Sequence, residues 1–281
     1  MNDETQQIPE LDPLPGKQTG TEVTKLVGLM QRLLAPGGCP WDREQTLQTL
    51  VPFLVEETYE VVDAIASGSA PDHQEELGDL LLQVVFQAEL RHAEGRFGID
   101  DVARGIVGKL VRRHPHVFGD VVAQNSQEAL SSWAKLKAQE KARKGKKGAL
   151  DGIPASAPAL LRASRGGEKA SAVGFDWKDA DGPRAKIDEE LAELDEARSR
   201  GAQGEIEREL GDLLLAVVNL ARKLDIDAES ALRGATDRFS SRFAHIEAAL
   251  AAQGREVADA SPEEQDRLWD AAKAALAAQR P

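Results

Sequence analysis

The feature that most constrains this chain is a phrase that it contains twice. "EELGDLLLQVVF" begins at Glu75, and "RELGDLLLAVVN" begins 133 residues later, at Arg208. A Glu-Glu-x-x-Glu segment precedes each copy, and its acidic residues keep the same offset of 133 positions. A repeat with this offset has the size of a domain. The 281-residue chain is therefore predicted to hold two similar units, each long enough for its own core.

Composition marks the boundaries of the two units. Residues 1–20 are polar and rich in proline, and we interpret them as a disordered tail with no apolar signal sequence. The first unit spans 21–142, a linker spans 143–159, and the second unit spans 160–281. The linker continues a basic run, "KARKGKK", that has no interleaved aromatic residues. This composition favours a solvated linker over a nucleic-acid site.

The hydrophobic pattern predicts an all-α fold for both units. Ala, Leu, Glu and Arg dominate, only 4% of residues are aromatic, and the β-branched residues fall at helical spacing. The predicted helices of the first unit are 21–34, 44–67, 73–94, 99–113 and 126–142. Those of the second unit are 183–199, 204–223, 227–252 and 262–279.

Charge and cysteine content limit the partners that the chain is expected to have. Hydrophobic residues make up 41% and charged residues 30%, which is typical of a soluble globular protein. The net charge of −13 argues against nucleic acid or an anionic membrane as a partner. No apolar run is long enough to span a bilayer. The single cysteine, Cys39, excludes an intramolecular disulfide framework and fits a reducing cytoplasm.

The repeated acidic residues are spaced to share helix faces. Residues three and four apart are neighbours on a helix, and the two helices of each unit are joined by a short connection that predicts antiparallel packing. Four or five carboxylates should therefore meet at the edge of an apolar seam. Such a cluster needs counter-charge, and a ligand set made only of oxygens favours a hard divalent cation such as Mg²⁺.

Each part of this pattern also has an ordinary explanation. Acidic residues in the first turn of a helix complement its dipole, and "EELGD" alone would be read that way. The combination, repeated at identical spacing, favours a metal site instead. The glycines inside the phrase, Gly78 and Gly211, each cost about 1 kcal/mol in a helix. We interpret them as positions that another backbone or side chain approaches closely.

Further motifs accompany the repeat and point to a known family. They are "CPWD" (Cys39 to Asp42), "RRHPHVFG" (Arg112 to Gly119) and "VGFDW" (Val173 to Trp177). With these motifs, about residues 22–278 resemble the MazG nucleoside triphosphate pyrophosphohydrolases. The resemblance implies tandem MazG-like helical-bundle domains and a homodimer. It also implies dependence on Mg²⁺, with Mn²⁺ as an alternative, and conversion of a nucleoside triphosphate and water into a nucleoside monophosphate and pyrophosphate.

The resemblance also implies roles for individual residues. The metal ligands would be Glu190, Glu193, Glu209 and Asp212 in the second unit, and Glu57, Glu60, Glu76 and Asp79 in the first. Glu189 is the candidate to orient or deprotonate the attacking water. Substrate would be held by Arg238, Arg242, Trp269 and Lys273 in the second unit, and by Lys109, Arg113, Trp133 and Lys137 in the first. Surface pairing with carboxylates is the alternative role for these cations. The family often has lysine where this chain has Arg238, which keeps the charge but changes the contact geometry.

Two segments are assigned no site. His114 and His116 flank a proline and have no counterpart in the second unit, which favours a role in a turn or in packing. "RGGEKASA" (Arg165 to Ala172) lies where the family has a basic helix, but its two adjacent glycines weaken helix formation.

The two units differ in polarity beside the acidic residues. Asn219 lies two turns after Asp212 and is predicted to face the site, whereas its counterpart in the first unit is Phe86. Lys186 precedes Glu190 by one turn, and its counterpart is Phe53. Phenylalanine cannot bind a phosphate. The second unit is therefore predicted to be the catalytic one, and the first to be a degenerate or differently selective site that mainly supports assembly.

Two other functions remain open from the sequence. A non-catalytic helical scaffold could bind metal or a protein partner through the acidic face, although ferritin-like sites use Glu-x-x-His pairs, which the repeated acidic segments of the two units lack. An enzyme of the same class could instead be specific for dUTP or for modified nucleotides.

Overall fold

The computed structural model describes residue 11 and residues 19–143 and 148–278, with the side chains of 134–135, 137–139, 141–143 and 278 left out. The predicted tail and the start of the predicted linker lie mostly outside the described residues. Within the described part of the chain there are helices and no strand, so the predicted all-α fold is confirmed. The chain divides into two compact units, residues 1–144 and 145–281.

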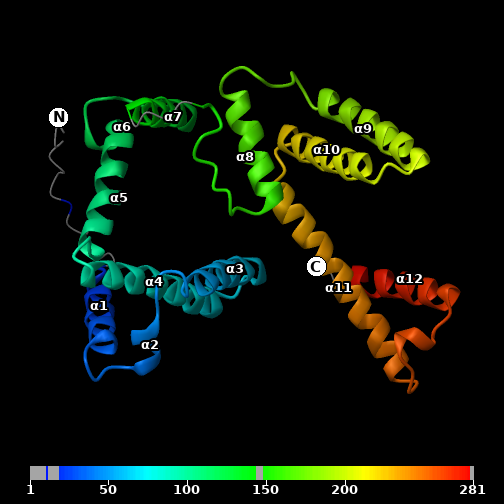
Figure 1. Cartoon of the computed structure of the whole chain (residues 1–281), viewed down its shortest axis with the longest axis horizontal. Helices are drawn as coiled ribbons and strands as arrows, with labels where there is room; N and C mark the ends of the chain where they lie inside the picture. The colour runs from blue at the N-terminus through cyan, green and yellow to red at the C-terminus, as the bar shows by residue number, and fades with distance from the viewer. Residues whose placement is uncertain (1–10, 12–18, 144–147, 279–281) are drawn as a thin grey trace. The chain divides into compact units, whose positions relative to one another are not determined.

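The first unit is built around a hairpin of two long helices. Its elements are α1 (Thr21–Leu34), α2 (Pro40–Glu44), α3 (Val51–Ser67), α4 (Ala70–Ala93), α5 (Ile99–Arg113), α6 (Pro115–Phe118) and α7 (Ser126–Arg143). Helices α3 and α4 pack side by side (Figure 1). Gly68 at φ 73° turns the chain between them, and the Ser69 hydroxyl caps α4 by accepting the Asp72 amide. The core beneath α4 contains Met30, Leu50, Val85 and Phe86.

The second unit contains two hairpins. Its elements are α8 (Ala159–Ser171), α9 (Asp181–Arg200), α10 (Gln203–Lys223), α11 (Ala228–Ala251), the 3₁₀ helix η1 (Val257–Asp259) and α12 (Pro262–Ala278). Gly201 at φ 66° ends α9 and lets α10 return beside it. Helix α12 folds back along α11 (Figure 1), over a small core of Ile246, Leu250 and Ala260.

One predicted helix is interrupted. The helix predicted at 44–67 is two helices, because α2 ends at Glu44 and α3 begins at Val51. The Thr46 and Thr49 hydroxyls each accept the other residue's amide and hold the turn between the helices. Pro52 lies in the first turn of α3, where a missing N–H costs nothing, so the sequence restarts the helix there.

One helix was not predicted. Residues 159–171 form α8 although Gly166 and Gly167 lower its helix propensity. A Cβ on Gly167 would lie 2.8 Å from both Asn219 Oδ1 and Arg222 Nε, so the glycine lets α8 approach α10 closely. The close approach predicted at Gly78 and Gly211 is wrong within this chain, since a Cβ at either position would meet no described atom within 4 Å.

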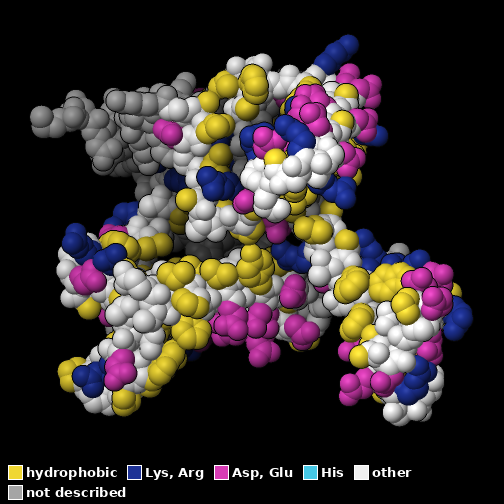
Figure 2. Space-filling model, turned by 45° about the vertical axis from the view of Figure 1, so that its right-hand side comes forward, with side chains coloured by type: hydrophobic (Ala, Val, Ile, Leu, Met, Phe, Trp, Pro, Cys, Tyr) yellow, Lys and Arg dark blue, Asp and Glu magenta, His cyan; other side chains and the backbone are white. Residues whose placement is uncertain are grey.

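Both central hairpins leave an apolar stripe uncovered. The stripe consists of Leu77, Leu81 and Val84 on α4 and of the matching Leu210, Leu214 and Val217 on α10. We call the three α4 residues the α4 stripe and the three α10 residues the α10 stripe. Figure 2 shows that hydrophobic side chains gather in exposed patches on the surface, next to groups of Asp and Glu. No helix in the described part of the chain is long and apolar enough to cross a membrane.

Candidate functional site

Three predicted ligands meet in the second unit. Glu190 and Glu193 on α9 and Glu209 on α10 each bring a carboxylate oxygen within 4.8 Å of the others. Glu190 and Glu209 are only 3% and 8% exposed. Glu190 Oε2 is buried and has no hydrogen-bond partner among the described residues. A buried, unpaired carboxylate oxygen is costly, and an all-oxygen donor set suits a hard divalent cation. The residues of this second-unit cluster therefore fit a metal ion such as Mg²⁺.

Basic side chains partly neutralise the second-unit cluster. Lys186 Nζ lies 2.8 Å from Glu189 Oε1 and 2.5 Å from Glu190 Oε1, and these contacts raise the pKa of Lys186. Arg208 contacts Glu209 at 2.6 Å. Even so, burial and then the neighbouring Glu190 and Glu209 raise the pKa of Glu193. The cluster therefore keeps an excess of negative charge that a cation would relieve.

The first unit holds an equivalent cluster without those cations. Glu57, Glu76 and Asp79 bring carboxylate oxygens within 4.8 Å of one another, and we call them the first-unit cluster. Burial, followed by Asp79 and Glu60, raises the pKa of Glu57. Burial and then Glu60 also raise the pKa of Glu76. The positions that match Lys186 and Arg208 are Phe53 and Glu75, so neither matching position supplies a basic side chain.

Neither cluster gathers all four predicted ligands. The tight group in the second unit does not include Asp212, and the group in the first unit does not include Glu60. Their counterparts, Asp79 and Glu193, do belong to the groups. Each of the four repeated positions is therefore drawn into a cluster in at least one unit.

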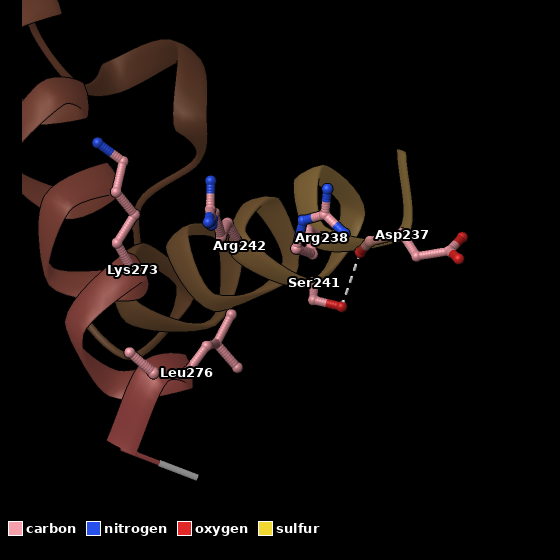
Figure 3. A pocket seen from close by; sticks show the side chains of 7 residues that line it. Asp237, Arg238, Ser241, Arg242, Lys273 and Leu276 are labelled. Carbon is pink, nitrogen blue, oxygen red and sulfur yellow. Dashed lines mark hydrogen bonds between the residues drawn. The ribbon is translucent and has the colours of Figure 1, made fainter. Parts of the chain in front are cut away.

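The predicted phosphate-binding cations of the second unit share one pocket. Arg238 and Arg242 from α11 and Lys273 from α12 line a pocket of about 290 Å³ (Figure 3). The Arg242 guanidinium lies 5.4 Å from the centre of the Trp269 ring. Lys273 contacts Asp270, whereas Arg238 and Arg242 make no ion pair with any residue that the structure describes. Two arginines are thus available to an anion.

The matching residues of the first unit are arranged differently. The Arg113 guanidinium lies 5.3 Å from the centre of the Trp133 ring, much as Arg242 lies on Trp269. Arg113 is also bound by Glu140, which the sequence pattern did not single out. Lys109 is exposed on α5, and the side chain of Lys137 lies outside the described residues.

Asn219 makes its hydrogen bonds away from the carboxylates. Its amide nitrogen donates to the Leu215 carbonyl at 3.1 Å, and its amide oxygen accepts from Arg222 Nη2 at 3.3 Å. In the first unit Phe86 belongs to the core, and Phe53 packs against that core. Both phenylalanines therefore have a packing role. A substrate-binding role for Asn219 stays a prediction.

Sequence reasoning missed one anchored residue, Asp176 of the "VGFDW" motif. Its carboxylate contacts Arg222 at 2.5 Å and Lys223 at 2.8 Å, and these two bases hold its pKa far below the usual range. The contacts fix the segment that leads into α9 against the last turn of α10. A conspicuous acidic residue in the motif and a basic helix end were the available signals.

His114 links α5 to α6, which agrees with the predicted turn role.

The fold and site define a class: an all-α protein with duplicated hairpins, each carrying a carboxylate cluster. Residues 45–118 and 183–246 match the MazG nucleotide pyrophosphohydrolase domain. The chain is 46% identical over 255 residues to a nucleoside triphosphate pyrophosphohydrolase of Escherichia coli (strain K12), an alignment that covers 90% of this chain and 97% of the relative. A nucleoside triphosphate pyrophosphohydrolase/pyrophosphatase MazG of Thermotoga maritima is 45% identical over 257 residues, covering 92% and 98%. The chain belongs to the MazG family.

Proposed function

We propose that this protein hydrolyses nucleoside triphosphates between the α- and β-phosphates, releasing a nucleoside monophosphate and pyrophosphate. The observation that carries the proposal is the second-unit cluster, where the buried Glu190 Oε2 has no partner in the described part of the chain and lies beside Glu193 and Glu209. The names of the relatives and the match to the family domain support the same reaction.

The proposed cofactor is Mg²⁺, with Mn²⁺ as an alternative. Glu190, Glu193 and Glu209 would hold it, and Asp212 would join them from the same face of α10 as Glu209. When bound, such a cation neutralises triphosphate charge and lowers the pKa of a coordinated water. It would also reverse the local sign of an acidic site in a chain of net charge −13.

The protein's own side chains supply the remaining chemistry. Glu189 is the proposed base that orients or deprotonates the attacking water, and Lys186 holds its carboxylate beside Glu190. Arg238, Arg242 and Lys273 are the proposed phosphate-binding residues, because they line one pocket and the two arginines form no ion pair with any described residue. The Arg242 guanidinium lies over the Trp269 ring, and the indole is the proposed group that packs on the base or sugar.

We assign the main activity to the second unit. Its cluster contains the cationic side chain of Lys186, whereas the first unit has Phe53 at the matching position. Once a metal ion binds the carboxylates, the lysine side chain is released to bind a substrate phosphate, and phenylalanine cannot bind one. The first unit would then serve mainly in assembly.

We also propose a homodimer that acts in the cytoplasm on nucleotides and binds neither nucleic acid nor membrane. The α4 stripe and the α10 stripe support the dimer, since exposed apolar rows at matched positions on two hairpins suggest a surface that another copy covers. The acidic balance supports a small-molecule substrate over nucleic acid. The lone Cys39 supports a reducing compartment.

Pyrophosphate release tests the reaction. The full chain is incubated with a panel of nucleoside triphosphates, dUTP and modified nucleotides among them, with Mg²⁺ and again with EDTA. We expect release of pyrophosphate and a monophosphate that EDTA abolishes. Release from one nucleotide alone would identify a specialised pyrophosphatase. No release from any nucleotide would contradict the proposal and favour the non-catalytic scaffold.

A further inference from the structure

The cation sites of the two units differ at one position that no motif singles out. Trp133 and Lys137 match Trp269 and Lys273 with an offset of 136 residues. Three residues further along, on the same helix face, the first unit has Glu140 and the second has Leu276. An acidic residue in one unit therefore corresponds to an apolar residue in the other.

In the first unit, Glu140 forms an ion pair with Arg113. Arg113 donates to Glu140 Oε2 through Nε at 3.1 Å and through a terminal nitrogen at 2.5 Å. Arg112 adds a longer contact of 3.7 Å to the other carboxylate oxygen. The Arg113 and Glu140 side chains are only 12% and 26% exposed. Arginine uses these same two N–H donors to bind phosphate oxygens, so Glu140 Oε2 stands where a phosphate oxygen would bind.

The second unit keeps the arginine and lacks the carboxylate. Arg242 lies on Trp269 at 5.4 Å, almost as Arg113 lies on Trp133 at 5.3 Å. Leu276 lines the pocket there and offers no acceptor (Figure 3). Throughout the described residues, Arg242 has no ion-pair partner. The same arginine–tryptophan pair is thus internally satisfied in one unit and open in the other.

We propose that Glu140 is an internal substitute for a phosphate group: it closes the arginine site of the first unit to polyphosphates, whereas Leu276 leaves the matching site of the second unit open. The inference rests on the proposed function, because it explains which unit takes the triphosphate. The explanation is independent of Lys186 and Asn219. A polyphosphate that enters the first unit must displace a carboxylate that is already paired with Arg113 and partly desolvated, and breaking that partly buried pair is costly.

The reciprocal substitution at the open site gives the first test. Leu276→Glu places a carboxylate on the same helix face as Lys273, within reach of Arg242, and Leu276→Gln is the neutral control of equal size. Binding of inorganic tripolyphosphate with Mg²⁺ is measured by titration calorimetry on the full chain. We expect Leu276→Glu to weaken binding at least about tenfold and Leu276→Gln to stay within about threefold, since only the first introduces a competing charge. Affinity of Leu276→Glu equal to that of the unaltered chain would overturn the proposal.

Removing the substitute gives the second test. Glu140→Leu copies the second unit, and Glu140→Gln is the isosteric variant if the first fails to fold, with circular dichroism as the check. We expect one tripolyphosphate per chain in the unaltered protein and two in the variant. A folded variant that still binds one per chain would overturn the proposal. These tests measure binding and not turnover. If the unaltered chain released no pyrophosphate from nucleotides, that result would contradict the proposed function and leave the result of the binding tests unaffected.

Discussion

At the residue scale, the chemistry of each cluster is set by how deeply its carboxylates are buried. The spacing of the acidic residues predicted that Glu190 and Glu209 would converge, because both lie on the facing sides of a hairpin. It did not predict that Arg208 would pair with Glu209, since a contact between adjacent residues depends on the rotamer. The hydrogen-bond partners of Asn219 were harder still to predict. Seven residues along a helix is a distance of about 10 Å, which is far enough for its amide to bond Leu215 and Arg222 of its own helix instead of reaching the carboxylates.

The raised pKa of Glu57 predicts a pH-dependent effect on stability. A carboxyl whose pKa is higher in the folded state stabilises the fold below the ordinary value of 4.5, and this contribution is lost as the pH rises through the folded value. At neutral pH without metal, Glu57→Gln should therefore raise the melting temperature, by about 2 °C. The gain should shrink as the pH is lowered towards 4.5.

Thermal unfolding in the presence of a chelator, followed by circular dichroism across that pH range, measures the effect. Glu56→Gln on the exposed neighbouring position is the matched control and should change little. A lower melting temperature for Glu57→Gln at neutral pH would show that the carboxylate is stabilising and that the repulsion argument is wrong.

At the element scale, hydrophobic periodicity was a good guide to the long helices and a poor one to α8. The α9–α10 hairpin follows from acidic and apolar residues at helical spacing, and the all-α class follows from it. Helix α8 was missed because two adjacent glycines have low helix propensity, and that local preference is overridden by packing on α10. The interruption before α3 was missed because Pro52 was counted as part of a continuing helix rather than a new first turn.

The two glycines of α8 should respond oppositely to alanine. Gly167→Ala places a Cβ 2.8 Å from Asn219 Oδ1 and Arg222 Nε, and Arg222 is held in place by Asp176, so we expect a loss of about 1 to 2 kcal/mol. Gly166→Ala meets no described atom within 4 Å and removes backbone freedom, so we expect a gain of about 0.5 to 1 kcal/mol. Urea unfolding measures both. Equal shifts in the two variants would refute the close approach of α8 to α10.

At the scale of the whole molecule, the repeat gives two units whose central hairpins are alike and whose cation sites are not. The stripes on α4 and α10 retain leucine or valine at matched positions although these side chains are exposed in the described part of the chain. Their exposure could not be predicted from periodicity, because an apolar helix face looks the same in sequence whether its own chain or another copy covers it.

The dimer proposal predicts a mass of twice 30.3 kDa in light scattering at micromolar concentration. Leu214→Glu places a charge in the α10 stripe and should shift the protein towards the monomer. Leu224→Glu, at an exposed leucine outside the stripe, is the control and should leave the mass unchanged. A monomer of 30.3 kDa with full activity would contradict the proposal.

The central claim is that the second-unit cluster performs the reaction, and paired substitutions of one matched residue test it most directly. Glu190→Gln and Glu57→Gln remove the same carboxylate from the two clusters and are otherwise equal in size and chemistry. Pyrophosphate release with Mg²⁺ is measured for both full-length variants. We predict that Glu190→Gln lowers turnover by about a hundredfold or more, since it removes a ligand on which charge stabilisation depends. Glu57→Gln should keep most of the activity. Equal losses in the two variants, or a larger loss in Glu57→Gln, would contradict the account.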